Sequence, residues 1–316
     1  MSTMSFLESF KKKGILIIFF VMILYVAIAL FGDLTKISES FLKIKLEFII
    51  LILGLETSSL IFRAIRQRQL LNQIGVKIPF VANLKIYFAG MSMVATPAGT
   101  GQMIKSHFIK QNYGYNISKT LPIVFVERYH DLLAVSCIIF ITLLVSFSWA
   151  TTIVLIISTV LIGGIFLIIK RKNLLLKVQQ KLTRIKFLKK LIPGPELNES
   201  LDNLSGGKIM ASAWSISIVS WILDGLAVYV AFLAFGQEFG ILQIFQFYFT
   251  SIAYGAISLI PGGVGITEGT MIGLLISEGL TISLATSIVL FVRITTIWFA
   301  TILGFISTRL VLKKGI

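Results

Sequence analysis

Charged residues are scarce in this chain, and so are cysteine and histidine. Only 14% of its 316 residues are Asp, Glu, Lys or Arg, whereas 56% are hydrophobic and the mean hydropathy is +0.92. A soluble protein of this length needs more charge to cover its surface. One cysteine, Cys137, excludes a disulfide framework, and two histidines, His107 and His130, leave little room for a zinc site. We therefore expect a helical membrane protein that holds no metal or other cofactor.

Acidic residues are fewer than basic ones, with 14 Asp and Glu against 29 Lys and Arg and a net charge of +15. In a soluble protein such an excess suggests binding to nucleic acid. In a membrane protein it has another cause, because Lys and Arg accumulate in cytoplasmic loops. We expect membrane lipids, and no nucleic acid, as partners.

Six apolar stretches approach the length of roughly 20 residues that a membrane-crossing helix needs. They cover residues 14–31, 46–62, 121–147, 151–169, 209–235 and 281–307. The first follows three lysines like a signal peptide, but its apolar run is longer than the usual h-region of about 7–15 residues, and we expect an uncleaved anchor. Two further apolar segments, 79–108 and 241–277, contain Pro and Gly clusters that break the helical character.

The distribution of basic residues predicts the orientation. Basic side chains concentrate in 63–85, 105–119 and the connector 170–208, whereas the short turns at 148–150, 236–240 and 278–280 have none. Under the positive-inside rule both termini are cytoplasmic, one broken segment enters from the cytoplasm and the other from outside. Each is either a re-entrant hairpin or a pair of short spans. We predict an all-α, polytopic cell-membrane protein with six full spans and two re-entrant hairpins, forming a single domain over residues 1–316.

The two broken segments share a P-x-G-x-G motif, and each is followed by a span that carries an arginine. The motif residues and their neighbours are Pro97, Gly99, Gly101 and Gln102 in the first segment and Pro261, Gly262, Gly263 and Gly265 in the second. Matching landmarks in opposite orientations indicate an inverted repeat, as in many secondary transporters, with halves over about 46–147 and 209–311. The alternative is two unrelated kinks, which membrane helices tolerate.

These motifs expose polar backbone groups, because proline removes a donor and glycine permits tight turns. Hydrocarbon cannot satisfy such groups, so they must face protein or a wet cavity. Helices that restart after Gly101 and Gly265 would direct partial positive charge toward an anion such as a lipid phosphate. We expect the two motifs to gate a hydrated central cavity.

Charged side chains inside the predicted membrane segments are the candidates for a headgroup site. Each costs about 2.5–3.5 kcal/mol at mid-bilayer, so it needs a partner or water. The candidates are Glu127, Arg128, Asp131, Asp224, Glu268 and Arg293. Arg128 and Asp131 are about one helical turn apart and can pair. Glu268 stands beside the second motif, where it can cap the helix or meet a cation. For Glu56 and Asp224, hydration near the membrane surface is the alternative.

Three stretches carry a family resemblance: Ala-Thr-Pro-Ala-Gly-Thr-Gly-Gln at 95–102, Val-Glu-Arg at 126–128 and Leu-Ile-Pro-Gly-Gly-Val-Gly-Ile-Thr-Glu at 259–268. They resemble the transmembrane region of lysylphosphatidylglycerol synthases, a flippase-like family also described as uncharacterised membrane protein family 0104. The family often has an acid where this chain has Gln102. The synthases also carry a large soluble aminoacyl-transferase domain, and no extramembrane stretch here approaches that length. The resemblance therefore implies the lipid-translocating part without the synthetic part.

Catalytic motifs are missing as well. The sequence has no P-loop, His-x-x-x-His pair or Gly-x-Ser-x-Gly motif, and we expect no enzymatic activity. The preferred function is transport of an amphipathic lipid, either an aminoacyl-phospholipid or a polyprenyl-phosphate-linked sugar. The alternatives are a secondary transporter of a small polar solute or ion, and a membrane enzyme acting on a lipid-linked substrate. A lipid-modifying enzyme is the candidate protein partner. The sequence leaves the substrate, direction, energy source and oligomeric state open.

Overall fold

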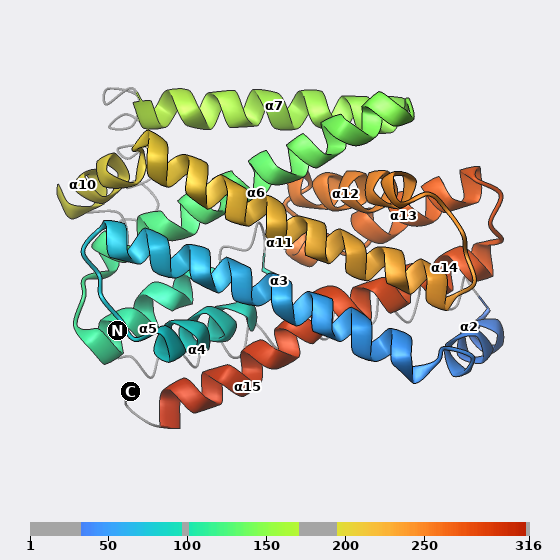
Figure 1. The fold of residues 1–316 in the computed structure, drawn as a ribbon, viewed down its shortest axis with the longest axis horizontal. Coiled ribbons are helices and arrows are strands. Elements are labelled where there is room, and N and C mark those ends of the chain that lie inside the picture. Colours follow the sequence, from blue (N-terminus) through green and yellow to red (C-terminus); the bar gives the residue numbers. More distant parts are fainter. Residues whose placement is uncertain (1–32, 97–100, 171–194, 314–316) are drawn as a thin grey trace.

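The computed structural model describes residues 33–96, 101–170 and 195–313, and the regular elements in these ranges are helical (Figure 1). Within them, five helices are long and apolar enough to cross a membrane. These are α3 (Leu46–Gln73), α6 (Ile117–Val145), α7 (Trp149–Lys170), α11 (Gly207–Ala234) and a continuous run over Ile282–Leu312. They correspond to five of the six predicted spans, and the remaining one, 14–31, lies outside the described residues.

The last of these spans changes its winding midway. It consists of α14 (Ile282–Arg293), a short π-helical stretch η3 (Ile294–Trp298) and α15 (Phe299–Lys313). A π-helical turn inserts an extra residue into the helical ladder and is frequent at functional sites. Here it directly follows Arg293, one of the predicted site residues.

Helix α3 is longer than predicted. The span predicted from hydropathy ends at residue 62, before the first basic side chains, whereas the helix continues to Gln73. The prediction that the span ends before Arg63 and Arg66 is therefore wrong, since both lie on α3 and are buried. The physical reason is that each finds a carboxylate on a neighbouring span, so the helix can keep these charges inside the bundle.

Shorter helices make up the two broken segments. The first contains α4 (Phe80–Met91) and α5 (Ile104–Tyr113), and its motif residues Pro97 and Gly99 lie outside the described residues. The second contains α12 (Ile241–Ile257) and α13 (Ile266–Ser277).

The second motif forms a tight turn between α12 and α13. A single 3₁₀ turn, η2 (Pro261–Gly263), occupies its centre. Gly262, Gly263 and Gly265 have φ values of 64°, 65° and 88°, in the left-handed region that glycine enters without a steric penalty. The chain thus breaks its helix at the predicted place, and the glycines are there because the turn requires them.

The long helices α3 and α11 pack against each other and run antiparallel through the middle of the bundle (Figure 1). Helices α4 and α5 lie toward one end of this pair, and α12 and α13 lie toward the other. The remaining packing is reciprocal: α6, which follows the first broken segment, packs on α12, while α15, which follows the second, packs on α4. Such an exchange of partners is expected of two halves related by a two-fold axis.

The contact between α15 and α4 is very close. A Cβ atom added at Gly304 would collide with the backbone nitrogen of Ser92, so the two backbones meet at this point. One turn further on, the Ser307 hydroxyl donates to the carbonyl oxygen of Lys85 at 3.0 Å. Small residues that let helix backbones approach are typical of membrane helix interfaces.

Helix α7 lies at the edge of the bundle (Figure 1). It exposes large apolar side chains along its length, among them Ile153, Ile156, Val160, Leu161 and Leu167. An exposed apolar surface of this extent suits contact with acyl chains rather than with water. Two short helices, α2 (Leu34–Leu42) and α10 (Pro195–Leu204), accompany the spans, and α2 packs on α14.

Candidate functional site

A band of charged side chains lies inside the bundle between α3, α6 and α11. Glu56, Arg63 and Arg66 occupy positions i, i+7 and i+10 of α3, a spacing that places them on one face of the helix. The side chains that face them are Glu127, Arg128 and Asp131 of α6 and Asp224 of α11. Below, we call these seven residues together with Lys105 of α5 the charged band.

Asp131 stands between two arginines. Nη1 of Arg66 donates to Oδ1 of Asp131 at 2.6 Å, and Nη2 of Arg128 lies 2.9 Å from Oδ2. The indole Nε1 of Trp221 donates to Oδ1 at 3.3 Å, and Arg66 also donates to the hydroxyl of Ser217. The predicted pairing of Arg128 with Asp131 is confirmed. Because one carboxylate balances only one of two guanidinium groups, this cluster has an excess of positive charge.

Arg128 is the accessible member of this cluster. Its side chain is 31% exposed, whereas that of Arg66 is completely buried. Besides Asp131 it reaches only the Oε1 atom of Gln102, at a long 3.4 Å, and its Nε has no hydrogen-bond partner among the described residues. Arg128 is therefore the more accessible of the two guanidinium groups that bind Asp131.

The other end of the charged band has more acid than base. Arg63 pairs with Asp224 and joins α3 to α11, and its guanidinium lies 4.2 Å from the centre of the Trp221 ring, a cation–π contact. Glu56 lies close enough to interact electrostatically with both charges. Its Oε1 makes no hydrogen bond within the part of the chain that the structure describes. The alternative of hydrated positions near the surface is wrong for Glu56 and Asp224, which are 4% and 6% exposed.

Lys105 belongs to α5, and its side chain lies among those of the charged band. It forms a buried ion pair with Glu127, and its ammonium group lies 4.9 Å from the centre of the Tyr87 ring. Its aliphatic part passes over Gly90, where a Cβ atom would collide with it. Although Lys105 belongs to the basic stretch 105–119, its side chain is buried, and the carboxylate of Glu127 compensates its charge.

Glu268 and Arg293 form a clamp around the second motif. Oε2 of Glu268 accepts a hydrogen bond from the Gly265 nitrogen at 2.7 Å, and Oε1 accepts one from Nε of Arg293 at 2.6 Å. Nη2 of Arg293 donates to the carbonyl oxygen of Gly262 at 2.6 Å. Glu268 thus both caps α13 and meets a cation. The N-terminus of α13 carries partial positive charge and was expected to bind a lipid phosphate. The carboxylate of Glu268 occupies this position instead.

Residues that flank the first motif repeat part of this arrangement. The hydroxyl of Thr96 accepts a hydrogen bond from the Gly101 nitrogen at 2.6 Å. Arg128 donates to Gln102, 26 residues earlier, much as Arg293 donates to a side chain 25 residues earlier. A Cβ atom added at Gly262 would lie 3.5 Å from the Cβ of Ala95. Ala95, two residues before the first motif, therefore lies beside Gly262 of the second.

The candidate residues named from the sequence do not include four members of the charged band, Glu56, Arg63, Arg66 and Lys105. A signal for three of them was present, because Glu56, Arg63 and Arg66 fall on one helical face. Treating the first arginine as the end of a span hid this pattern. No local signal points to Lys105, since its partner Glu127 belongs to a different helix.

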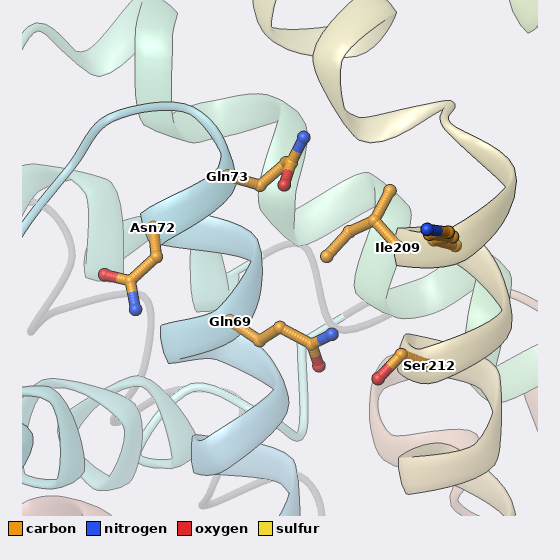
Figure 2. Close-up of a pocket in the computed structure, with 6 residues that line it drawn as sticks. Gln69, Asn72, Gln73, Ile209 and Ser212 are labelled. Atoms are coloured by element: carbon orange, nitrogen blue, oxygen red, sulfur yellow. The ribbon is translucent and has the colours of Figure 1, made fainter.

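A polar pocket of about 490 Å³ opens between the end of α3 and the start of α11. It is lined by Gln69, Asn72, Gln73, Lys208, Ile209 and Ser212. Figure 2 shows Gln69 and Ser212 directed into the space between the two helices. Gln69 follows Arg66 by about one turn of α3, so the pocket lies next to the charged band along the helix axis.

Long apolar helices, an apolar outer surface and charges paired inside the bundle define a polytopic membrane protein. The profile of the family described as Lysylphosphatidylglycerol synthase TM region matches residues 14–304, and this chain belongs to that family. The resemblance found in the sequence is thus confirmed.

Several archaeal proteins are similar over different shares of the chain. A UPF0104 membrane protein of Pyrococcus horikoshii is 27% identical over 334 residues, which cover 96% of this chain and 97% of that protein. One of Methanocaldococcus jannaschii is 26% identical over 237 residues, covering 69% of this chain and 94% of the relative. One of Methanothermobacter thermautotrophicus is 36% identical over 89 residues, 28% of this chain and 27% of that protein.

Proposed function

We propose that this protein moves an amphipathic lipid with a phosphate-containing headgroup across the bilayer. The observation that carries the proposal is the pair of arginines on Asp131, of which Arg128 is partly exposed. Guanidinium groups bind phosphate oxygens through paired, charge-assisted hydrogen bonds. A phosphate beside Arg128 would balance the surplus cation of this cluster. Both lipids expected from the sequence, an aminoacyl-phospholipid and a polyprenyl-phosphate-linked sugar, present such a phosphate.

The headgroup enters through the pocket between α3 and α11. Its amide and hydroxyl side chains offer hydrogen bonds to a polar headgroup, and Lys208 adds a positive charge. One helical turn is about 5.4 Å, so a headgroup in the pocket lies roughly one turn from Arg66. With both termini cytoplasmic, as the basic residues favour, this pocket faces the cytoplasm. The family description refers to the synthesis of a lipid, which supports a lipid substrate here.

The two motifs act as the gates of an inverted repeat. The reciprocal packing of α6 on α12 and of α15 on α4 supports this arrangement, and so do the parallel contacts of Arg128 and Arg293 with their preceding segments. We infer that the close approach of Ala95 to Gly262 closes a path between the two ends of the bundle and that their separation opens it. Alternating access by one half rocking against the other is the usual behaviour of such repeats.

Lipid movement is measured in phosphatidylcholine vesicles that contain the purified protein and a trace of fluorescent phosphatidylglycerol, lysylphosphatidylglycerol or polyprenyl-phosphate sugar. Dithionite added outside quenches the probe in the outer leaflet and reports its exchange. We expect faster exchange than in vesicles without protein. Arg128→Ala should slow it roughly tenfold or more, because a hydrogen bond to a charged group contributes about 1.5–3 kcal/mol.

The matched control is Arg309→Ala on α15, which removes an exposed arginine and should leave the exchange rate unchanged. Equal rates with and without protein for all three probes would overturn the proposal. Uptake of a small polar solute in the same vesicles, without lipid exchange, would favour a solute transporter instead.

A further inference from the structure

The charged band balances its charges as a whole but not at each end. Its carboxyl groups are Glu56, Glu127, Asp131 and Asp224, and its cations are Arg63, Arg66, Lys105 and Arg128. At one end two acids share Arg63, and at the other two arginines share Asp131. The first end thus has a surplus carboxyl group, and the second has a surplus cation.

Glu56 is the surplus carboxyl group. The groups near enough to interact electrostatically with it are Arg63 on the same helix, Asp224 on α11 and the phenol of Tyr248 on α12, and Asp131 of α6 interacts in turn with Arg63. Among these the only cation is Arg63, which Asp224 already engages in an ion pair. An ionised carboxylate buried without a partner is very costly, and such a group takes up a proton instead. The free Oε1 of Glu56 is where that proton binds.

A proton suits this position better than a metal ion. Metal cations such as Ca²⁺ or Mg²⁺ require several oxygen ligands around them. The neighbouring Arg63 would repel such an ion, whereas a single carboxyl oxygen is enough for a proton. The site therefore favours a proton over a metal ion, because it provides too few oxygen ligands for a metal and because Arg63 repels metal cations.

We propose that Glu56 is a proton-binding site and that its proton crosses the membrane together with the anionic headgroup held at Arg128. The inference rests on the proposed function, since the headgroup comes from it. With a proton on Glu56 the charged band has one net positive charge, and a singly negative headgroup at Arg128 neutralises it. The band is then neutral when it holds both ligands or neither, and charged when it holds only one. Because charge is costly inside the membrane, the doubly loaded and the empty forms change conformation most easily.

The coupling is tested in vesicles of phosphatidylcholine with a trace of fluorescent phosphatidylglycerol, which has one negative charge. A pH difference of one unit should drive phosphatidylglycerol toward the less acidic side until its leaflet ratio is about tenfold, since one pH unit corresponds to a factor of ten for one coupled proton. A protonophore should return the ratio to about one.

The variant Glu56→Gln imitates the protonated side chain and removes the site. It should still exchange phosphatidylglycerol between leaflets, but the leaflet ratio should stay at about one under the same pH difference. The matched control is Glu47→Gln, the same change at an exposed position in the first turn of α3, which should keep the tenfold ratio. The infrared band of a protonated carboxyl group should be present in the wild type and in Glu47→Gln and reduced in Glu56→Gln.

The outcomes separate the two proposals. If the wild-type protein exchanges lipid but the pH difference creates no leaflet ratio, the proton coupling is wrong while the lipid function stands. If the infrared band is the same in Glu56→Gln as in the wild type, Glu56 does not hold the proton. If no lipid probe moves at all, the proposed function fails, and the infrared band alone then decides whether Glu56 is protonated.

Discussion

The side chain of Arg293 binds Glu268 through Nε at 2.6 Å across 25 residues of sequence and uses Nη2 for the carbonyl oxygen of Gly262. One guanidinium group thus connects α14 to both sides of the turn that breaks the second segment. Both partners of the ion pair are buried, so neither can exchange the other for water. The turn keeps its shape because this clamp satisfies polar groups that a break in a membrane helix would otherwise leave unpaired.

Replacing Arg293 should destabilise the protein strongly. Arg293→Ala leaves Glu268 as a buried carboxylate without its cation, for which a loss of about 3–5 kcal/mol in the free energy of unfolding is expected. Arg293→Lys should recover only part of it, because an ammonium group cannot reach both acceptors in the fixed geometry of a guanidinium. Unfolding of the detergent-solubilised variants by heat or denaturant measures the difference. Arg309→Ala is the control, and a loss no larger than that of the control would show that the clamp is not a stabilising contact.

The close approach of α15 to α4 predicts a second effect on stability. Gly304→Ala adds a methyl group where the Ser92 nitrogen already lies, so the helices must separate, at a cost of about 1–3 kcal/mol. Gly163→Ala on α7 adds the same group in open space, and by helix propensity it should be neutral or stabilise by up to about 1 kcal/mol. Unfolding of both variants in the same detergent gives the comparison. Equal stability of the two would contradict the packing described for α15.

Replacing either partner of the ion pair between Arg63 and Asp224 should lower the free energy of unfolding, but by different amounts. Arg63→Met leaves Glu56 and Asp224 without their shared cation, and we expect the full cost of about 3–5 kcal/mol for a broken buried pair. Asp224→Asn should cost less, because Glu56 can then release its proton and pair with Arg63. The double variant should lose less than the sum of the single ones, since residues in one network are not additive. If the two single variants lose equal free energy of unfolding and the double variant loses their sum, these three groups do not interact.

Much of the fold could be predicted from the sequence, because apolar runs of bilayer length report membrane spans directly. The predicted stretches 121–147, 151–169 and 209–235 agree with α6, α7 and α11 within a few residues. The end of α3 could not be predicted in this way. Hydropathy treats Arg63 as a membrane boundary, and only the position of Asp224 on α11, 161 residues away, explains why an arginine stays inside.

The candidate site was predicted only where its contacts are local in sequence. Arg128 and Asp131 lie one turn apart on a single helix, and local spacing was enough to expect their ion pair. The proximity of Glu268 to the second motif was also local and predicted a helix cap. The partners Arg66 and Lys105 come from other helices, and their contribution depends on how the spans pack, which a single sequence does not encode in local pattern.

The proximity of Ala95 and Gly262 predicts a disulfide that locks the protein. Ala95→Cys and Gly262→Cys, combined with Cys137→Ser, place two Cβ atoms about 3.5 Å apart, within the range of about 3.5–4.5 Å that disulfides require. Cysteine at Gly262 must adopt a positive φ, a strain of about 1–2 kcal/mol that the rest of the clamp can hold. Oxidation should form the bond and stop lipid exchange in vesicles, and reduction should restore it. Ala95→Cys with Gly273→Cys is the control pair, because no atom lies within 4 Å of a Cβ at Gly273 and no bond should form. Exchange that continues at the wild-type rate with the first bond in place would show that the motifs need not separate, and the gating role would then be wrong.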